Sequence, residues 1–233
     1  MPDLLQVENL AKRFGGIVAT DDLSIAIPEG QLHAVIGPNG AGKTTLIAQL
    51  SGQLTPDSGR IRFAGNDITA LPMPARSALG LARSFQITSL FLDLSVLDNV
   101  ALAVQAHTGH SFHFWRNARE QPELRDPARA ALARVGLKAR ENLPASALSH
   151  GEHRQLELAM ALASKPRMLL LDEPMAGLGP EESARMVAML RELKKELTIL
   201  LVEHDMEAVF ALADRITVRS EERRVGKECR SRW

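Results

Sequence analysis

Residues 37–44 constrain the fold of this chain most strongly, because they read Gly-Pro-Asn-Gly-Ala-Gly-Lys-Thr, a complete G-x-x-x-x-G-K-[ST] pattern. Residues 32–36 before it are apolar, as in a short buried strand, and residues 45–50 after it have helical spacing. Glycines let the N–H groups of such a loop turn inward at the start of a helix, where anions are favoured. The segment therefore predicts a loop that wraps a chain of phosphates. Its spacing is not G-x-G-x-x-G, so it does not indicate a dinucleotide-binding fold.

The side chains of this loop supply a charge and a metal ligand. Lys43 provides a positive charge for the outer phosphates, and the Thr44 hydroxyl is a suitable ligand for Mg²⁺. The alternative, a flexible glycine-rich turn without a ligand, is disfavoured by the strand before the loop and the helix after it. The predicted nucleotide contacts of the loop are Gly37, Pro38, Asn39, Gly40, Ala41, Gly42, Lys43, Thr44 and Thr45.

Composition narrows the class of protein. The chain has 233 residues, of which 45% are hydrophobic, enough for one large domain or two small lobes. The 28 basic residues balance the 28 acidic ones, which argues against nucleic acid as the main partner. The apolar runs, such as residues 197–202, have the length of strands, and the N-terminus lacks the pattern of an export signal. A single cysteine, Cys229, excludes a disulfide framework and a cysteine metal cluster. We expect a soluble cytosolic chain.

Hydrophobic patterns alternate between strands and helices. Strand patterns occur at residues 23–27, 32–36, 60–63, 167–172 and 198–202. Helical patterns fill residues 95–165, with Val96, Val100 and Val104 on one face and Ala128, Leu132 and Val135 on another, and recur over residues 186–197. Strands that alternate with helices predict an α/β fold with a mainly parallel sheet covered on both faces.

Two carboxylates follow the apolar run that ends at residue 171. Asp172 and Glu173 are predicted at the C-terminal edge of a buried strand, and open α/β sheets bind ligands at that edge. Asp172 is placed to hold Mg²⁺ opposite Thr44, and Glu173 is the candidate for polarising an attacking water. The alternative is that residues 172–174 only form a turn at the end of the strand.

Residues 148–155, Leu-Ser-His-Gly-Glu-His-Arg-Gln, begin another predicted helix. Ser149 and Glu152 fit a capping box, while the Ser149 hydroxyl and the Gly151 N–H suit the binding of a γ-phosphate. Together with the phosphate loop and the acidic strand, this segment resembles the signature motif of the ATP-binding subunits of ABC transporters. The resemblance covers nearly all of residues 4–218. This chain departs from the family pattern in having His150 at a variable position and Glu152 where glutamine is commoner.

The resemblance implies a P-loop NTPase core with a mainly parallel sheet, an N-terminal antiparallel β subdomain and an inserted helical subdomain at about residues 87–165, all within a domain of residues 1–218. It implies ATP and Mg²⁺ as ligands and ATP hydrolysis as the activity. It also implies a head-to-tail dimer with an identical or a different ATPase subunit, in which each ATP lies between one phosphate loop and the partner's signature. The partners implied are transmembrane permease subunits and a periplasmic binding protein, with this chain peripheral on the cytoplasmic face of the membrane.

The same resemblance assigns roles to three further residues. Gln86 matches the glutamine that links the metal to the helical subdomain, His204 the histidine that contacts the γ-phosphate, and Phe14 the aromatic on which adenine stacks. Without the resemblance, the usual interpretations of these residues are a surface glutamine, a polar residue that caps a strand and a core aromatic. The predicted catalytic residues are thus Lys43, Gln86, Glu173 and His204, the metal ligands Thr44, Gln86 and Asp172, and the further nucleotide contacts Phe14, Ser149, Gly151 and Asp172. Residues 175–180 match the loop that crosses the dimer, and Gly179 stands where Asp is usual, so this loop receives no side-chain role.

Residues 83–86, 148–152 and 176–180, with an insertion near residues 107–120, together resemble importers of branched-chain amino acids. The alternatives left open are import of urea or short amides, export of lipopolysaccharide, a related ATPase that acts on DNA or ribosomes, and a nucleotide-binding regulator without turnover. His107, His110 and His113 have the three-residue spacing of metal ligands, but Gly109 and Ser111 interrupt the helical pattern. We expect a solvated insertion there.

Residues 219–233 depart from the family pattern. This stretch holds six Lys and Arg residues against three Glu, together with Cys229 and Trp233, where relatives continue with a glycine turn and another strand. We expect the stretch to be a non-native junction and leave it out of fold reasoning. The functional alternative is a basic tail that binds a membrane or nucleic acid.

Overall fold

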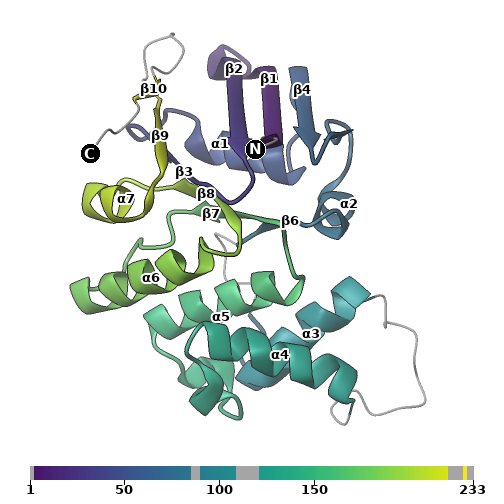
Figure 1. Ribbon diagram of the computed structural model, residues 1–233, viewed down its shortest axis with the longest axis vertical. Coiled ribbons are helices and arrows are strands. Elements are labelled where there is room, and N and C mark those ends of the chain that lie inside the picture. The colour runs from purple at the N-terminus through teal and green to yellow at the C-terminus, as the bar shows by residue number, and fades with distance from the viewer. Residues whose placement is uncertain (1–2, 85–89, 109–120, 220–227, 230–233) are drawn as a thin grey trace.

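The computed structural model describes residues 3–84, 90–108, 121–219 and 228–229. They form two sheets and a block of helices, stacked from one end of the molecule to the other (Figure 1). The first sheet is antiparallel, with the order β2-β1-β4-β5, and contains β1 (Asp3–Phe14), β2 (Ile17–Pro28), β4 (Ser58–Phe63) and β5 (Asn66–Asp67). The predicted antiparallel N-terminal part of the chain is confirmed.

The second sheet has the order β10-β9-β3-β8-β7-β6. Its strands are β3 (Leu32–Ile36), β6 (Leu81–Arg83), β7 (Met168–Asp172), β8 (Thr198–Val202), β9 (Arg215–Val218) and β10 (Glu228–Cys229). The five strands from β9 to β6 run parallel, and β10 is antiparallel to β9. The α/β fold with a mainly parallel sheet, predicted from the alternation of strands and helices, is therefore confirmed.

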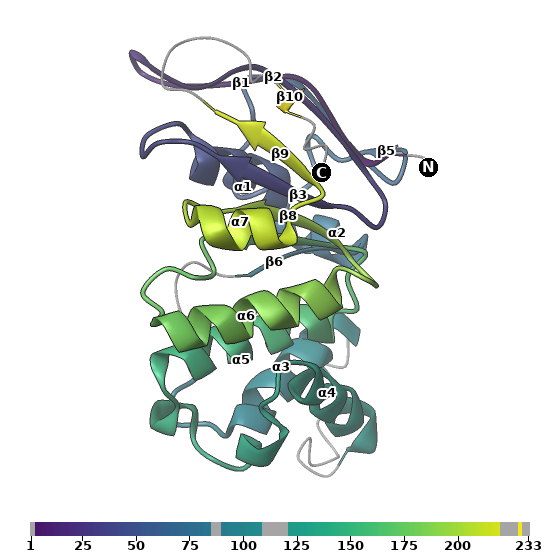
Figure 2. The same cartoon turned by 60° about the vertical axis from the view of Figure 1, so that its left-hand side comes forward.

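Both faces of the parallel sheet are buried, which explains why its strands read as unbroken apolar runs. Successive side chains of β7 face opposite sides. Met168 and Leu170 share a core with α1 (Lys43–Ser51) and the antiparallel sheet, whereas Leu169 and Leu171 share a core with the helices on the other face. Figure 2 shows α1 between the two sheets and α6 (Pro180–Leu193) beneath the parallel one.

The remaining helices are α2 (Met73–Ala78), α3 (Val96–Thr108), α4 (Pro122–Arg134), α5 (His150–Ala163) and α7 (Met206–Leu212), and 3₁₀ turns occur at Lys138–Arg140 and Ala145–Ala147. Helices α3, α4 and α5 pack on one another, and Val96, Val100 and Val104 face their common core, as their spacing predicts. The helix predicted over residues 186–197 begins earlier and ends at Leu193, because the chain turns back there toward β8. None of the helices in the described part of the chain is long and apolar enough to cross a lipid bilayer.

The stretch left out of fold reasoning makes contacts with the rest of the fold. Its first residue, Arg219, continues β9 by donating its N–H to the carbonyl of Ile36 at 2.8 Å. Farther along, β10 pairs with β9 and lies at the end of the described sheet. The sequence analysis missed both contacts, since the composition of the stretch carries no strand pattern.

Candidate nucleotide-binding site

The phosphate loop connects β3 to α1 at the C-terminal edge of the parallel sheet. Gly42 caps α1 with a left-handed backbone (φ 74°), a conformation that glycine adopts without strain. The Lys43 side chain turns back into the loop and donates hydrogen bonds to the carbonyls of Gly37 (2.7 Å) and Pro38 (2.9 Å). Its ammonium group therefore lies within the loop, where outer phosphates are expected. Thr44 is exposed in the first turn of α1, as a metal-binding hydroxyl must be.

The loop lies closely against two neighbouring segments, and this contact requires glycine at both ends. A Cβ at Gly42 would lie 2.0 Å from the carbonyl oxygen of Ala19 in β2, and one at Gly37 would lie 2.3 Å from that of Arg219. The Arg219 guanidinium also donates to the carbonyls of Gly42 (2.8 Å) and Ala19 (2.9 Å). The exposed Pro38, Asn39 and Gly40 form the opposite, open side of the loop.

Asp172 ends β7, two strands away from the loop in the same sheet. Its side chain is fully buried, and its Oδ2 atom lies 3.2 Å from the guanidinium of Arg83. Burial raises the pKa of Asp172, while Arg83 and Lys43 act in the opposite direction. The other carboxylate oxygen, Oδ1, is buried without a hydrogen-bond partner among the described residues.

This arrangement fits a magnesium ion. Mg²⁺ takes oxygen ligands and is usually held by one or two protein groups together with phosphate oxygens and water. The orphaned Oδ1 of Asp172 and the exposed hydroxyl of Thr44 supply such oxygens at the same edge of the sheet. No cluster of three His, Cys, Asp or Glu residues exists in the described ranges, so the protein alone offers no complete cage there.

Glu173 follows Asp172 with a left-handed backbone (φ 51°), which is unusual for a residue other than glycine. Its N–H donates to the carbonyl of Val202 at the end of β8, and its partly exposed carboxylate lies 4.0 Å from Nδ1 of His204. Strained backbone of this kind occurs at functional sites more often than elsewhere. The structure thus brings Glu173 and the exposed His204 together beside Asp172.

Glu203 was not predicted, yet its carboxylate organises this edge. It is fully buried and accepts hydrogen bonds from the N–H groups of Met175 (2.9 Å), His204 (3.0 Å) and Asp205 (3.3 Å). It therefore ties the turn that carries Glu173 to the loop that carries His204. A charged residue placed directly after a fully apolar strand is the signal that could have revealed it.

Two of the residues assigned by resemblance have different outcomes. Phe14 ends β1 with 48% of its surface exposed, and the ammonium of Lys12 lies 5.8 Å from its ring centre. The ring is therefore not a core residue, and it offers a face for stacking. Gln86 lies outside the described residues, as do His110 and His113 of the histidine triplet.

The signature residues lie on the helical side of the molecule. Ser149 caps α5 and forms the predicted capping box, accepting from the Glu152 N–H (3.2 Å) and donating its own N–H to the Glu152 carboxylate (2.9 Å). Ser149 and Gly151 line a hollow of about 470 Å³ with Glu182 and Arg185 of α6. No hydrogen bond or ion pair among the described residues joins them to the phosphate loop of their own chain.

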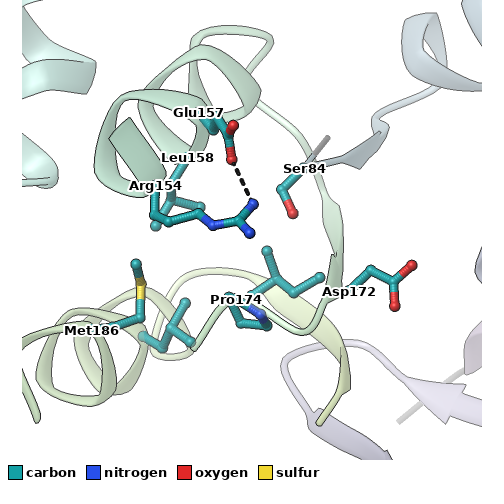
Figure 3. Close-up of a pocket in the computed structure, with 9 residues that line it drawn as sticks. Ser84, Arg154, Glu157, Leu158, Asp172, Pro174 and Met186 are labelled. Carbon is teal, nitrogen blue, oxygen red and sulfur yellow. Dashed lines mark hydrogen bonds and ion pairs between the residues drawn. The ribbon is translucent and has the colours of Figure 1, made fainter. Parts of the chain in front are cut away.

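A small cavity separates α5 from the ends of β6 and β7 (Figure 3). Arg154 reaches across it from α5 and pairs with Glu157 one turn on at 3.2 Å, with Ser84 facing the same space. Asp172 borders the cavity on the side away from Arg154. Burial raises the pKa of Glu157, and Arg154 opposes this effect.

Comparison with known proteins agrees with these observations. The family described as ABC transporter matches residues 20–176. The chain is 37% identical over 225 residues to the high-affinity branched-chain amino acid transport ATP-binding protein BraF of Pseudomonas aeruginosa, covering 92% of this chain and 87% of BraF. It is 38% identical over 222 residues to LivG of Salmonella typhimurium, a protein of the same description, with the same coverage of both chains.

Solved structures give the same result. The ADP conformation of an ATP-binding cassette of an ABC transporter matches with a TM-score of 0.86 and 29% identity, covering 99% of this chain and 92% of that one. CbiO1 from Clostridium perfringens, part of an ABC transporter complex, matches with a TM-score of 0.81. The resemblance proposed from the phosphate loop, the acidic strand and the signature is thereby confirmed. The chain belongs to the ABC transporter family and is one of its ATP-binding subunits, which hydrolyse ATP.

Proposed function

We propose that this chain hydrolyses Mg²⁺-bound ATP to power an importer of branched-chain amino acids. The observation that carries the catalytic part is the convergence of Lys43, Asp172, Glu173 and His204 at the ends of neighbouring strands. The cargo follows from the relatives, since BraF and LivG are both named as branched-chain amino acid transport proteins. ABC ATP-binding subunits of this kind work with permeases, so we place the chain peripherally on the cytoplasmic face of the membrane.

Each residue of the site has a defined task in this proposal. The N–H groups of residues 37–45 surround the phosphates, and Lys43 offsets charge on the outer ones. Thr44 and Asp172 hold Mg²⁺, which neutralises phosphate charge when bound. Glu173 orients the attacking water, with His204 at the γ-phosphate. Phe14 stacks on adenine through its exposed face.

The second half of each site comes from another subunit. Ser149 and Gly151 present a hydroxyl and a helix N-terminus on the surface, away from their own phosphate loop. We propose that they bind the γ-phosphate held by an identical or related ATPase subunit, and that Gln86 transmits closure of this dimer to the helical block. In this scheme residues 1–218 form the ATPase domain, residues 87–165 its inserted helical subdomain, and residues 219–233 a non-native stretch.

The cargo is selected by the permease subunits and the periplasmic binding protein, so nothing at the nucleotide site chooses it. Urea or short-amide import and lipopolysaccharide export therefore stay as alternatives. Reconstitution with the permease subunits and binding protein of the same system separates them. ATP-dependent uptake of leucine, isoleucine or valine into vesicles is expected, and uptake of urea alone would contradict the proposed cargo.

The catalytic part is tested by comparing wild type with Glu173→Gln. The variant is expected to bind ATP, but its turnover rate should fall by about 100-fold or more, because general-base catalysis increases reaction rates by about 10²–10⁴-fold. It is also expected to elute as an ATP-held dimer in size-exclusion chromatography with ATP and Mg²⁺. Glu192→Gln is the matched control, since Glu192 is exposed at the far end of α6. Near-normal turnover in Glu173→Gln would refute the role given to Glu173.

A further inference from the structure

Arg83 is the last residue of β6, and its guanidinium is the ion-pair partner of the buried carboxylate of Asp172. We propose that Arg83 is a positioning residue for the magnesium site, one that fixes the orientation of the Asp172 carboxylate so that Oδ1 faces the metal. The inference rests on the proposed Mg²⁺ requirement and goes beyond it, because the residues assigned to the metal are Thr44, Gln86 and Asp172.

Arg83 and Asp172 form a close ion pair between buried side chains. The Asp172 side chain is 0% exposed and that of Arg83 is 7% exposed, with 3.2 Å between Nη2 and Oδ2. The other arm of the guanidinium donates to Oε1 of Gln53, just beyond the end of α1. The Arg83 backbone pairs with Leu170, two residues before Asp172 on the adjacent strand. Gln53 therefore holds one end of the Arg83 guanidinium and the pairing with β7 fixes the Arg83 backbone, while the other end of the guanidinium contacts the Asp172 carboxylate.

Burial explains why this partner matters. A carboxylate removed from water is strongly destabilised unless it is paired and hydrogen-bonded. Lys43 is the other cation close enough to influence Asp172, but its ammonium is engaged by the carbonyls of Gly37 and Pro38. Arg83 is thus the group that compensates the charge of Asp172 directly within the described part of the chain.

The contact also distinguishes the two carboxylate oxygens. Arg83 occupies Oδ2, and Oδ1 is buried with no hydrogen-bond partner among the described residues. A buried oxygen without a partner is unfavourable unless a ligand or water satisfies it. Since Oδ2 is held by Arg83, Oδ1 is the oxygen left to bind the metal or a water on it. Groups that hold a metal ligand in place in this way contribute about 10–100-fold to metal affinity.

The test measures the Mg²⁺ dependence of nucleotide binding, not turnover. Fluorescence of a methylanthraniloyl derivative of ATP is followed on the purified full chain, first in EDTA and then during titration with MgCl₂. For Arg83→Gln we expect the Mg²⁺ concentration at half-maximal response to rise about tenfold or more, with nucleotide affinity in EDTA within about twofold of wild type. A residue needed only for folding would weaken binding under both conditions.

Two further variants keep the test decisive if Arg83→Gln does not fold, as judged by circular dichroism. Arg83→Lys keeps the charge without the planar fork and is expected to give a smaller shift. Gln53→Ala removes the anchor of Arg83 and is expected to shift the midpoint in the same direction. Arg125→Gln is the matched control. It breaks another ion pair, with Asp98 at 2.9 Å, whose side chains are mostly buried and lie away from the nucleotide site, so it should leave the midpoint unchanged.

The possible outcomes separate this inference from the proposed function. An unchanged or lower Mg²⁺ midpoint in the folded Arg83 variants would overturn the positioning role while leaving the ATPase assignment intact. A lower midpoint would mean that Arg83 competes with the metal for Asp172. If wild-type binding is insensitive to Mg²⁺, the proposed metal requirement is wrong and the inference is wrong with it.

Discussion

Arg76 provides the clearest test of how the phosphate-loop helix is held in the fold. It lies in α2, is 1% exposed, and is a charged side chain buried without a carboxylate partner in the described structure. Its guanidinium donates to four carbonyl oxygens: Gln49 (2.7 Å), Leu50 (2.8 Å), Leu71 (2.8 Å) and Thr69 (2.9 Å). The first two belong to the last turn of α1, where the Gln49 carbonyl also accepts from the N–H of the cap residue Gly52 at 3.3 Å.

The cost of Arg76→Met follows from these contacts. Hydrogen bonds from a charged donor contribute about 1.5–3 kcal/mol each, and buried carbonyls left unpaired add to the loss. The substitution also removes the cost of burying a guanidinium, which lowers the sum. We therefore expect a net loss of about 3 kcal/mol in the free energy of unfolding. For a chain of this size, that corresponds to a decrease in melting temperature of about 6–12 °C.

Differential scanning calorimetry of wild type and variant measures this decrease. Arg60→Met is the matched control, because Arg60 pairs with Asp67 at 3.3 Å with both side chains about half exposed. Exposed pairs of this kind contribute about 0–1 kcal/mol, so the control should melt within about 4 °C of wild type. A shift in Arg76→Met no larger than that of the control would refute the reasoning that the four carbonyls depend on Arg76.

Two further predictions concern buried carboxylates. Glu203→Gln places an amide NH₂ group among three N–H donors. We therefore expect calorimetry to show a decrease in melting temperature of about 4–8 °C. Steady-state hydrolysis is expected to show a decrease in kcat of about tenfold, with ATP affinity retained. Burial raises the pKa of the Glu157 carboxyl in the folded state. The contribution of Glu157 to stability is therefore complete only below the pKa that this group has in the unfolded chain, and it is lost as pH rises through the raised pKa of the folded state. Glu157→Gln avoids that loss, so its melting temperature should rise relative to wild type as the pH increases from the ordinary carboxyl pKa of 4.5 through the raised one. A difference that stays constant with pH would contradict this.

The strands and the phosphate loop were predictable because each carries a local signal. β3, β7 and β8 are short apolar runs that could only be buried on both faces, and the loop pattern stands directly between a strand and a helix. α2 and β6 were not predicted. They contain six and three residues, and such short elements are specified by their tertiary neighbours more than by any periodicity of their own.

The site was predictable where motif and position in the sheet agree. Lys43, Asp172 and Glu173 follow from the strands that precede them, since parallel strands end at the same edge. Glu203 and Arg83 were missed because their roles depend on partners far away in the chain. Glu203 accepts from Met175, and Arg83 contacts both Gln53 and Asp172. A lone basic or acidic residue after a strand has no spacing that identifies such partners.

At the end of β6, contacts with distant parts of the chain position residues whose own sequence carries only a weak pattern. Arg83 and Ser84 are consecutive, so their side chains face opposite sides of the sheet. Arg83 reaches Asp172 on the nucleotide side, and Ser84 faces the cavity that Arg154 spans from α5, as Figure 3 shows. The Ser84 N–H also donates to the carbonyl of Leu170, which continues the pairing with β7 beyond the end of β6. A three-residue strand is thereby connected to the buried carboxylate of Asp172 on one side and borders the cavity beside α5 on the other.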